Sequence, residues 1–451
     1  MPSCAKFSRF WLLVLLPATL LAVDGAPDPD FQGPGGYVAY SAGVPSHLAG
    51  RGTIAPDGAA IFVSHRTSTS SIFLVSRVTA TDGPQSYQFS AAGATDVHPS
   101  QAVFDSAGRL LIVGTATYTG PGLVVMVARI LYPDMTLDAS FDGDGYVTFD
   151  PPEDLLGVAI APVIVPLGPL RVERLVVAGT LLAPTGSSGD DFLVLRLTEA
   201  GSLDSGFGGG DGWVRHDFDL QDNALYDLQI DSLDRLVLGG TIDWTGDSDG
   251  MVARLLPNGT LDSTFGDSGW TRIEPDVDPV DERLFALTLA NDDSIWTAGI
   301  KARTGPTEQL VVHHLDTAGV DDYALGGFIL PAQFWVAGVE RQGDGRLIVF
   351  GDTDRRDGDR DLFVTACRPT SFFPCSWEAD FGPLDSDHLS YPLADLVAGG
   401  DESAGGMALA AGRPILFADA ATATTRKAVV MRLENTYVFA DGFESAGQTY
   451  W

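Results

Sequence analysis

The chain has 451 residues, with 27 Lys and Arg against 60 Asp and Glu, and a formal net charge of −33 at pH 7. A field of this sign repels nucleic acids and anionic lipid surfaces, so we exclude both as partners. The charge is compatible with cationic partners and divalent cations. We expect a monomer whose partner is a protein or a carbohydrate.

Residues 1–26 have the features of a secretory signal peptide. Lys6 and Arg9 supply positive charge before an apolar run that ends at Leu21, and small residues follow it. The run is too short to span a bilayer, and no later segment is long and apolar enough to do so. We expect an exported protein, secreted or at the cell surface, with the periplasm as an alternative.

Of the three cysteines, Cys4 lies in the predicted signal peptide. Cys367 and Cys375 remain in "ACRPTSFFPCSW". Outside the cell a pair this close oxidises readily and closes a short loop. A metal site is the alternative, but no His or further Cys is nearby, so we predict a disulfide between Cys367 and Cys375.

A phenylalanine-glycine motif recurs along the chain. Its copies are "LDASFDGDGYVTF" around Phe141, "LDSGFGGGDGWVRHDF" around Phe207 and "LDSTFGDSGWTRI" around Phe265, with weaker copies at Tyr323 and Phe381. From Phe207 onward the anchor residues are 58 positions apart. A fixed period of this length is the signature of a repeat architecture.

Each repeat also contains runs that are typical of β-strands. One follows a tight turn, as in "DRLVLGGT" from Asp234, and another ends in Arg, as in "MVARL" at Arg254. A run such as "LYDLQID" precedes them and another follows the motif, so each repeat reads as four strands. Both of the first two runs occur seven times. We predict an all-β fold over residues 27–433, a β-propeller with seven four-stranded blades, and keep a β-solenoid as the alternative.

The unit "VARLLPNGTLDSTFGDSGW" resembles the delta-60 repeat proteins, a family of exported bacterial proteins whose repeats are assigned a β-propeller fold. The resemblance is strongest at residues 123–147, 191–215 and 249–272, and weaker copies extend it over about 28–433. It implies architecture and export, and it supplies no catalytic residues.

Two segments compete to complete the last blade. The stretch "DPDFQGPGGYVAY" copies the motif around Phe31, while the last strand, at Arg432, lacks a following copy. An N-terminal strand would close the ring and remove open sheet edges. The tail could place Phe443 in the same slot, but residues 434–451 resemble the DGFESG-like C-terminal tails of otherwise unrelated exported bacterial proteins. We predict ring closure by the N-terminal strand and a separate tail.

Within the motif, an Arg precedes an Asp by 8 or 9 residues, and a Phe follows that Asp by three. A hairpin of this length places the guanidinium beside the carboxylate. Substrate binding is one interpretation, but repetition favours a structural contact because a single active site breaks the symmetry. The residues are Arg129, Asp138 and Phe141; Arg196, Asp204 and Phe207; and Arg254, Asp262 and Phe265.

Two serines lie in motifs known from hydrolases, and we assign both to turns. Ser268 lies in "GDSG", but other repeats have Asp144, or Gly210 or Asp211, in this slot, and no His-Asp pair is near. Ser248 lies in "GDSDG", which leads into a strand rather than the helix that a nucleophile elbow requires. We predict no catalytic residues.

The segment "GDTDRRDGDRDLF" is the candidate metal site, for calcium, because alternating carboxylates supply hard oxygen ligands. Three arginines offset their charge and the glycine of an EF-hand loop is missing, so a solvated hairpin is the alternative. The aspartates are Asp352, Asp354, Asp357, Asp359 and Asp361.

Tryptophans are the candidate ligand-binding residues. Trp335 lies near the start of an inner strand, where propellers often bind ligands at the mouth of the channel. It can stack on a sugar ring or belong to the core, and Trp244 and Trp296 have the same two interpretations.

These features predict a non-catalytic binding or surface-interaction module. One alternative is a secreted polysaccharide hydrolase or lyase with carboxylates at the channel mouth, such as Asp222, Asp154 or Glu282. Glycoside hydrolysis would need two of them within about 10 Å of each other. The other alternative is a structural protein stabilised by calcium.

Overall fold

A computed structural model of the chain describes residues 28, 30–32, 37–40, 46–48, 50–66, 72–119, 122–151, 153–167, 170–183, 189–218, 221–244, 247–273, 281–302, 308–330, 333–354, 360–369, 376–377, 401–421 and 426–433. Within these ranges the regular structure is almost entirely β-strand, and the exception is a short 3₁₀ turn, η1 (Gly208–Gly210). None of the helical structure found there is long and apolar enough to cross a membrane.

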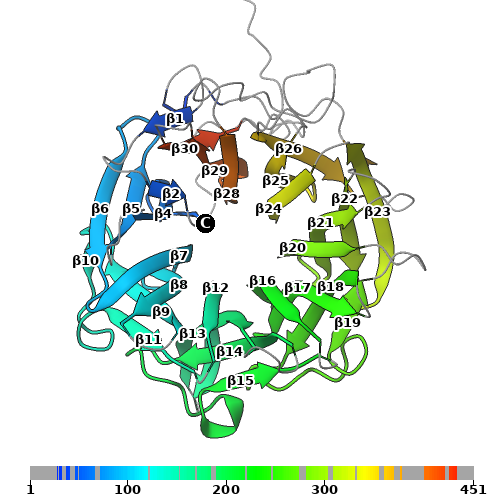
Figure 1. The fold of residues 1–451 in the computed structure, drawn as a ribbon, viewed down its shortest axis with the longest axis horizontal. Helices are drawn as coiled ribbons and strands as arrows, with labels where there is room; N and C mark the ends of the chain where they lie inside the picture. The colour runs from blue at the N-terminus through cyan, green and yellow to red at the C-terminus, as the bar shows by residue number, and fades with distance from the viewer. Residues whose placement is uncertain are drawn as a thin grey trace, which may run out of the picture.

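Seven antiparallel sheets stand around a central axis, and each contributes its first strand to the inside of the ring (Figure 1). We number these sheets as blades 1 to 7 in chain order. The predicted β-propeller with seven four-stranded blades is therefore confirmed.

The blades have the following strands. Blade 1 contains β2 (Ser46–Leu48), β4 (Ala60–Arg66), β5 (Ile72–Val78) and β6 (Gln85–Ser90), with the short β3 (Thr53–Ile54) beside β4. Blade 2 contains β7 (Ala94–Phe104), β8 (Leu110–Tyr118), β9 (Leu123–Leu131) and β11 (Tyr146–Phe149), with β10 (Thr136–Leu137) beside β9. Blade 3 contains β12 (Leu155–Leu167), β13 (Leu170–Leu181), β14 (Asp191–Leu197) and β15 (Trp213–His216). Blade 4 contains β16 (Asn223–Ile230), β17 (Leu236–Trp244), β18 (Asp247–Leu255) and β19 (Trp270–Ile273).

The remaining blades follow the same order. Blade 5 contains β20 (Glu282–Leu289), β21 (Ile295–Ala302), β22 (Glu308–Leu315) and β23 (Asp321–Leu330). Blade 6 contains β24 (Gln333–Arg341), β25 (Leu347–Asp354), β26 (Arg360–Arg368) and β27 (Ser376–Trp377). Blade 7 contains β28 (Asp401–Ala410), β29 (Arg413–Ala421), β30 (Arg426–Arg432) and β1 (Tyr37–Tyr40).

Blade 7 joins the two ends of the propeller. The N-terminal strand β1 pairs antiparallel with β30, with Tyr37 opposite Met431 and Tyr40 opposite Ala428. This confirms the predicted closure by the N-terminal strand, which removes the edge that β30 would otherwise expose. The predicted tail, residues 434–451, lies outside the described residues.

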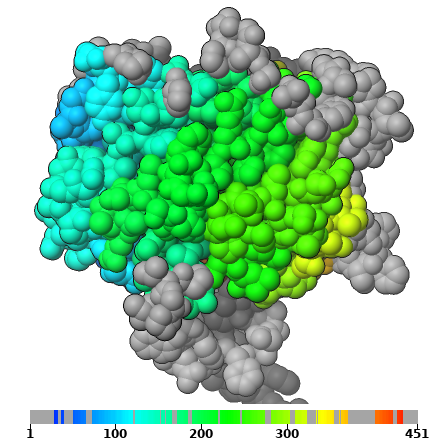
Figure 2. All heavy atoms as spheres, turned by 90° about the horizontal axis from the view of Figure 1, so that it is seen from below, coloured from blue at the N-terminus to red at the C-terminus, as the bar shows by residue number. Residues whose placement is uncertain are grey.

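The core consists of apolar layers between neighbouring blades. Between blades 4 and 5, for example, Val252 and Phe265 pack with Leu284 and Leu287, and all four side chains are buried. Burying a side chain of this size contributes about 1.5–3 kcal/mol. Figure 2 shows part of the outside of the ring, where the blades coloured cyan to yellow-green lie next to one another.

Candidate functional site

The same side-chain contact is repeated between neighbouring blades in the middle of the chain, and it is the reference against which the other blades are compared. In blade 4, Arg254 Nε donates to Asp262 Oδ2 at 2.9 Å, and the guanidinium lies 4.4 Å from the centre of the Phe265 ring. Arg254 Nη1 also donates to the carbonyl oxygen of Thr317 in blade 5 at 2.6 Å. Gly319 follows with φ +80°, and a Cβ there would lie 2.8 Å from the Phe265 ring, so a side chain would clash. We call this Arg-Asp-Phe arrangement the strut.

Blades 2 and 3 contain the same strut. The Arg and Asp atoms are 2.8 Å apart in blade 2 and 3.0 Å apart in blade 3, and each Arg also donates to a carbonyl oxygen in the next blade. Burial lowers the pKa of each strut arginine, and its aspartate opposes this effect. The two struts are Arg129, Asp138 and Phe141, with Glu199 as the acceptor, and Arg196, Asp204 and Phe207, with Pro257 as the acceptor. The repeated residues therefore tie blade to blade.

Blade 5 departs from this pattern at the arginine. His314 stands in the strut arginine position, because it pairs across the sheet with Trp296 as Arg254 pairs with Val237. In the same register the aspartate position is Asp322, eight residues after His314, and its side chain lies outside the described part of the structure. Tyr323 is the residue 58 positions after Phe265 in the sequence. Blade 5 therefore lacks the strut.

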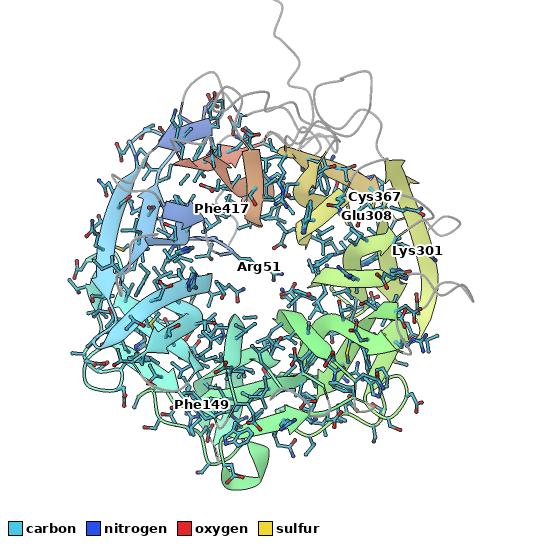
Figure 3. All side chains as sticks on the ribbon, in the orientation of Figure 1. Arg51, Phe149, Lys301, Glu308, Cys367 and Phe417 are labelled. Carbon is cyan, nitrogen blue, oxygen red and sulfur yellow. The ribbon has the colours of Figure 1, made fainter. Side chains whose placement is uncertain are left out.

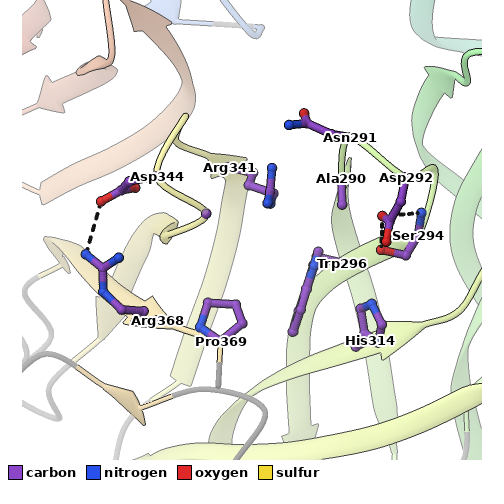
Figure 4. Close-up of a pocket in the computed structure, with 11 residues that line it drawn as sticks. Ala290, Asn291, Asp292, Ser294, Trp296, His314, Arg341, Asp344, Arg368 and Pro369 are labelled. Carbon is purple, nitrogen blue, oxygen red and sulfur yellow. Dashed lines mark hydrogen bonds and ion pairs between the residues drawn. The ribbon is translucent and has the colours of Figure 1, made fainter. Parts of the chain in front are cut away.

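A pocket of about 540 Å³ lies at the interface of blades 5 and 6, at the position that a strut would occupy (Figure 4). The turn between β20 and β21 and the turn between β24 and β25 form two of its sides, and the end of β26 forms a third. Its lining includes Asn291, Asp292, Trp296, His314, Arg341 and Arg368. The symmetry-breaking sequence of blade 5 thus coincides with a cavity of the size that ligand sites have.

Trp296 and His314 form the apolar side of this pocket. Their ring centres are 4.4 Å apart, with the planes inclined by 41°. Figure 4 shows His314 on one side of the Trp296 indole, with Pro369 and Arg341 on the other. Trp296 retains 7 % of its exposure, so a ligand would reach one part of the indole rather than the whole ring. Trp296, one of the three candidate tryptophans, thus borders a pocket of the described structure.

The polar side of the pocket carries two carboxylates that are already engaged. Asp292 Oδ1 accepts hydrogen bonds from Ser294 Oγ at 2.8 Å and from the Ser294 backbone at 3.2 Å, and the side-chain bond is the main cause of its lowered pKa. Asp344 Oδ2 accepts from Arg368 Nη2 at 3.0 Å. Burial alone would raise the pKa of Asp344, but hydrogen bonds from the Arg346 backbone and from Arg368 lower it. Both groups are ionised at neutral pH.

Arg51 occupies the axis of the ring. Its side chain reaches from blade 1 to blade 4, where Nη1 donates to Asp227 and Nη2 donates to the carbonyl oxygen of Tyr226 at 3.2 Å (Figure 3). Nη2 also lies 3.3 Å from the carbonyl oxygen of Phe285 in blade 5. Near this ion pair, burial and the Asp227 charge raise the pKa of Glu340 to about 7, while Arg51 lowers it. Neither Arg51 nor Glu340 stands out in the sequence, because the contact crosses the ring.

Two of the carboxylates proposed for a hydrolase or lyase hold turns instead. Asp154 Oδ1 accepts the Leu123 N–H at 2.8 Å, and Asp222 Oδ1 accepts the Asp190 N–H at 3.0 Å. Between blades 4 and 5, Asp281 Oδ1 accepts the Ser248 N–H at 3.0 Å in the same way. These aspartates precede successive inner strands, so they are another repeated contact rather than one converging site. Asp222 also lines a smaller pocket of about 170 Å³ with Asp243 and Arg283.

Glu282, the third of those carboxylates, is buried within blade 5. Its Oε1 lies 2.5 Å from His313 Nε2, and Asp321 Oδ2 lies 3.2 Å from His313 Nδ1. Lys301 Nζ is 3.9 Å from Glu282 Oε2. Burial alone would lower the pKa of His313, but the two carboxylates raise it to about 9. Glu282 therefore belongs to a buried ion cluster and is not among the residues that line the pocket between blades 5 and 6.

Of the predicted calcium ligands, the structure describes the side chain of Asp352. Its Oδ2 accepts the Ala404 N–H of blade 7 at 3.0 Å, and its Oδ1 lies 3.5 Å from Arg360 Nη1. Burial raises the pKa of Asp352 to about 6. Asp357 and Asp359 lie outside the described residues, as do the side chains of the strand residues Asp354 and Asp361. Calcium binding stays a prediction.

Trp335 lies in β24, and the Arg360 guanidinium covers its ring at 4.0 Å from the ring centre. Trp335 lines neither of the two pockets described here. Trp244 ends β17, and its side chain lies outside the described part of the structure. Cys367 is buried in β26, and Cys375 lies outside the described residues, so the disulfide also stays a prediction.

The two serines lie in turn or hairpin positions. Ser268 is exposed, with φ +62°, and its Oγ lies 3.4 Å from its neighbour Asp267. Ser248 lies in β18, directly after a hairpin, and its Oγ donates to Asp243 Oδ1 at 2.5 Å. For neither serine does the described structure show a histidine as hydrogen-bond partner, which a nucleophile of this class requires.

Comparisons with known proteins bear on the fold. The family model of the domain of unknown function (DUF5122) beta-propeller matches residues 174–207 and 234–265, which lie in blades 3 and 4. A comparison with curated protein sequences finds no match.

Among solved structures, the polysaccharide lyase Uly1 is similar at 10 % identity, over 90 % of this chain and 93 % of that chain, with a TM-score of 0.49. Domains 1–2 of the Drosophila Semaphorin 1a ectodomain are similar at 10 % identity, over 87 % of each chain, with a TM-score of 0.43. A protein of unknown function from Dyadobacter fermentans is similar at 11 % identity, over 88 % of this chain and 100 % of that chain, with a TM-score of 0.40. These likenesses are too remote to bear on activity or ligand. The family match and the seven sheets together show that the chain is a β-propeller repeat protein.

Proposed function

We propose that this protein is an exported, non-catalytic binding module of the delta-60 repeat type, and that it binds a carbohydrate in the pocket between blades 5 and 6. The observation that carries the proposal is that the pocket lies where the sequence of blade 5 departs from the repeat. The pocket lies at the interface where His314 replaces the strut arginine and Trp296 replaces the aliphatic residue opposite it.

The composition of the pocket favours a saccharide. Trp296 offers the accessible part of its indole to the C–H groups of a sugar ring. Asn291 and Asp292 lie at the rim as hydrogen-bonding groups for hydroxyls. A cavity that combines an aromatic wall with a few polar groups fixes both the position and the orientation of a ligand.

The carboxylates of the pocket support binding rather than catalysis. A general acid for cleavage of a glycosidic bond needs a raised pKa so that it holds its proton at neutral pH. Asp292 and Asp344 have lowered pKa values instead. The first is held by Ser294 and the second by Arg368, so neither is prepared to donate a proton.

The test is calorimetric titration of the purified protein with a panel of neutral and acidic oligosaccharides. Trp296→Val introduces the residue that blades 3 and 4 have at this position, and Trp335→Val makes the same change in blade 6 as a matched control. We expect at least one saccharide to bind, Trp296→Val to weaken that binding about tenfold or more, and Trp335→Val to leave it intact. Thermal unfolding checks that both variants are folded. Binding that depends on Trp335 and not on Trp296, or no binding at all, would refute the proposal.

A further inference from the structure

We propose that the saccharide is acidic, and that Arg341 binds its carboxylate, which makes the ligand a uronate-bearing oligosaccharide. This inference rests on the proposed function, because it concerns the same pocket. It adds the chemical class of the ligand and the residue that selects it.

Arg341 is the last residue of β24, and its side chain is half-buried and lines the pocket (Figure 4). Within the described part of the chain, no carboxylate and no carbonyl oxygen forms an ion pair or hydrogen bond with it. Gly345 lies close to the guanidinium: a Cβ added at Gly345 would be 3.4 Å from Arg341 Nη2. A guanidinium that faces a pocket without a partner is prepared for an anion.

Other arginines in the turns between the first and second strands of a blade have partners, and Arg346, which holds the place of Arg109 and Arg235 in blade 6, donates to Gln342 Oε1 at 2.6 Å. Arg109 and Arg235 of the blade 2 and blade 4 turns each bind an aspartate, at 2.6 Å and 2.5 Å. The chain has 60 acidic residues for 27 basic ones, so a carboxylate partner is easily supplied. That Arg341 has none in the described structure leaves a positive charge directed at the cavity.

The two acids of the pocket do not remove this charge. Asp344 is neutralised by Arg368 at 3.0 Å, and Asp292 accepts both of its hydrogen bonds from Ser294. Asp292 can still accept a hydroxyl proton from a sugar, because a carboxylate has about four lone-pair sites. The pocket therefore offers an aromatic wall, a hydroxyl acceptor and one unpaired guanidinium.

A planar carboxylate matches the guanidinium because two parallel N–H···O bonds can form. A uronate places its carboxylate at the edge of the sugar ring. One ring in contact with the accessible part of Trp296 can then present hydroxyls toward Asp292 and its carboxylate toward Arg341 (Figure 4). A neutral hexose would contact Trp296 and donate to Asp292 but leave the Arg341 guanidinium unpaired.

The experiment uses hexasaccharides of galacturonate, glucuronate and mannuronate, each compared with its methyl ester, which keeps size and stereochemistry but removes the charge. In about 0.15 M salt, which screens the long-range repulsion from the net charge of −33, we expect at least one acid form to bind about tenfold or more tightly than its ester. Arg341→Gln should abolish that difference and leave ester binding unchanged. Arg341→Lys should restore part of it, because the charge returns without the bidentate geometry. Arg171→Gln, an exposed arginine of blade 3, is the matched control and should behave as the unmodified protein.

The outcomes separate the two proposals. Equal binding of acid and ester, with both lost in Trp296→Val, overturns the acidic ligand and leaves the carbohydrate module intact. An acid preference that survives Arg341→Gln likewise overturns the role of Arg341. Sulfated oligosaccharides serve as a further arm, and binding of these without binding of uronates also overturns the inference. Absence of binding to every saccharide overturns both proposals.

Discussion

Asp28 Oδ2 accepts a hydrogen bond from Arg432 Nε at 2.7 Å, although the two residues are 404 positions apart in the sequence. Asp28 is fully buried, and Arg413 also donates to the same oxygen. The Arg432 guanidinium lies 5.0 Å from the centre of the Phe31 ring. Phe31 follows Asp28 by three residues, as Phe265 follows Asp262. The ring is therefore closed by a strut whose Asp and Phe come from one end of the propeller and whose Arg comes from the other.

Replacement of Asp28 should weaken this closure. Asp28→Ala leaves two guanidinium groups without their shared carboxylate, and losing one partner of a buried ion pair costs about 3–5 kcal/mol. We expect a lower free energy of unfolding in urea, with easier detachment of the N-terminal strand in hydrogen exchange. Asp30→Ala removes an exposed carboxylate two residues away and is the control. Equal stability of the two variants would show that closure does not depend on this contact.

The strut of blade 4 should require arginine specifically. Arg254 binds Asp262, the Phe265 ring and the Thr317 carbonyl oxygen at once, and lysine cannot reproduce this planar geometry. We expect Arg254→Lys to be destabilised by about 2–4 kcal/mol in urea unfolding. Arg171→Lys, at an exposed ion pair, should change stability by less than about 1 kcal/mol. A fully stable Arg254→Lys would mean that charge alone maintains the blade interface.

The buried cluster of His313, Glu282 and Asp321 in blade 5 should make the free energy of unfolding decrease at alkaline pH. The pKa of His313 is raised from 6.5 to about 9 by Asp321 and Glu282, so the folded state holds a proton that the unfolded state releases. The resulting stabilisation, on the order of 3 kcal/mol, is complete below about pH 6.5 and is lost as the pH rises through 9. Urea unfolding at pH 6, 7.5 and 9 measures it. His313→Gln should flatten this part of the profile, and an unchanged slope would exclude His313 as its source.

Glu340 at the ring axis should act in a lower pH window. Burial and the Asp227 charge raise its pKa from 4.5 to about 7, so the folded state favours the protonated acid. The associated stabilisation is present below about pH 4.5 and is lost as the pH rises through 7. Glu340→Gln keeps the shape without the charge, so its stability relative to the unmodified protein should increase between pH 5 and 8. If the difference between the two proteins is constant over this range, Glu340 does not titrate as described.

The fold could be predicted because each of its determinants is local and repeated. The 58-residue spacing from Phe207 onward sets the unit, and alternating runs such as "MVARL" mark its strands. The closure of the ring could also be predicted, because the segment around Phe31 copies the motif and the strand at Arg432 lacks a following copy of it. The additional contact of Arg413 with Asp28 could not be predicted, because no local sequence pattern relates the two residues.

The pocket was only partly predictable, because it arises from what blade 5 lacks. The replacement of the strut arginine by His314 is visible in the sequence, and Trp296 is one of the candidate aromatics. Their pairing depends on strand register, and the role of Arg341 depends on how the blade 6 turn meets blade 5. The contact of Arg51 could not be predicted either, since its partner Asp227 is three blades away. Asp154 and Asp222, which the sequence offered as carboxylates of a channel-mouth site, hold equivalent turns in space.

A crystal structure of the protein soaked with the tightest-binding oligosaccharide tests the central claim most directly. We predict a sugar ring against Trp296 in the pocket between blades 5 and 6, with Arg341 in contact with it. Sugar density at the ring axis beside Arg51, or in the smaller pocket beside Asp222, with the Trp296 pocket empty, would contradict the account.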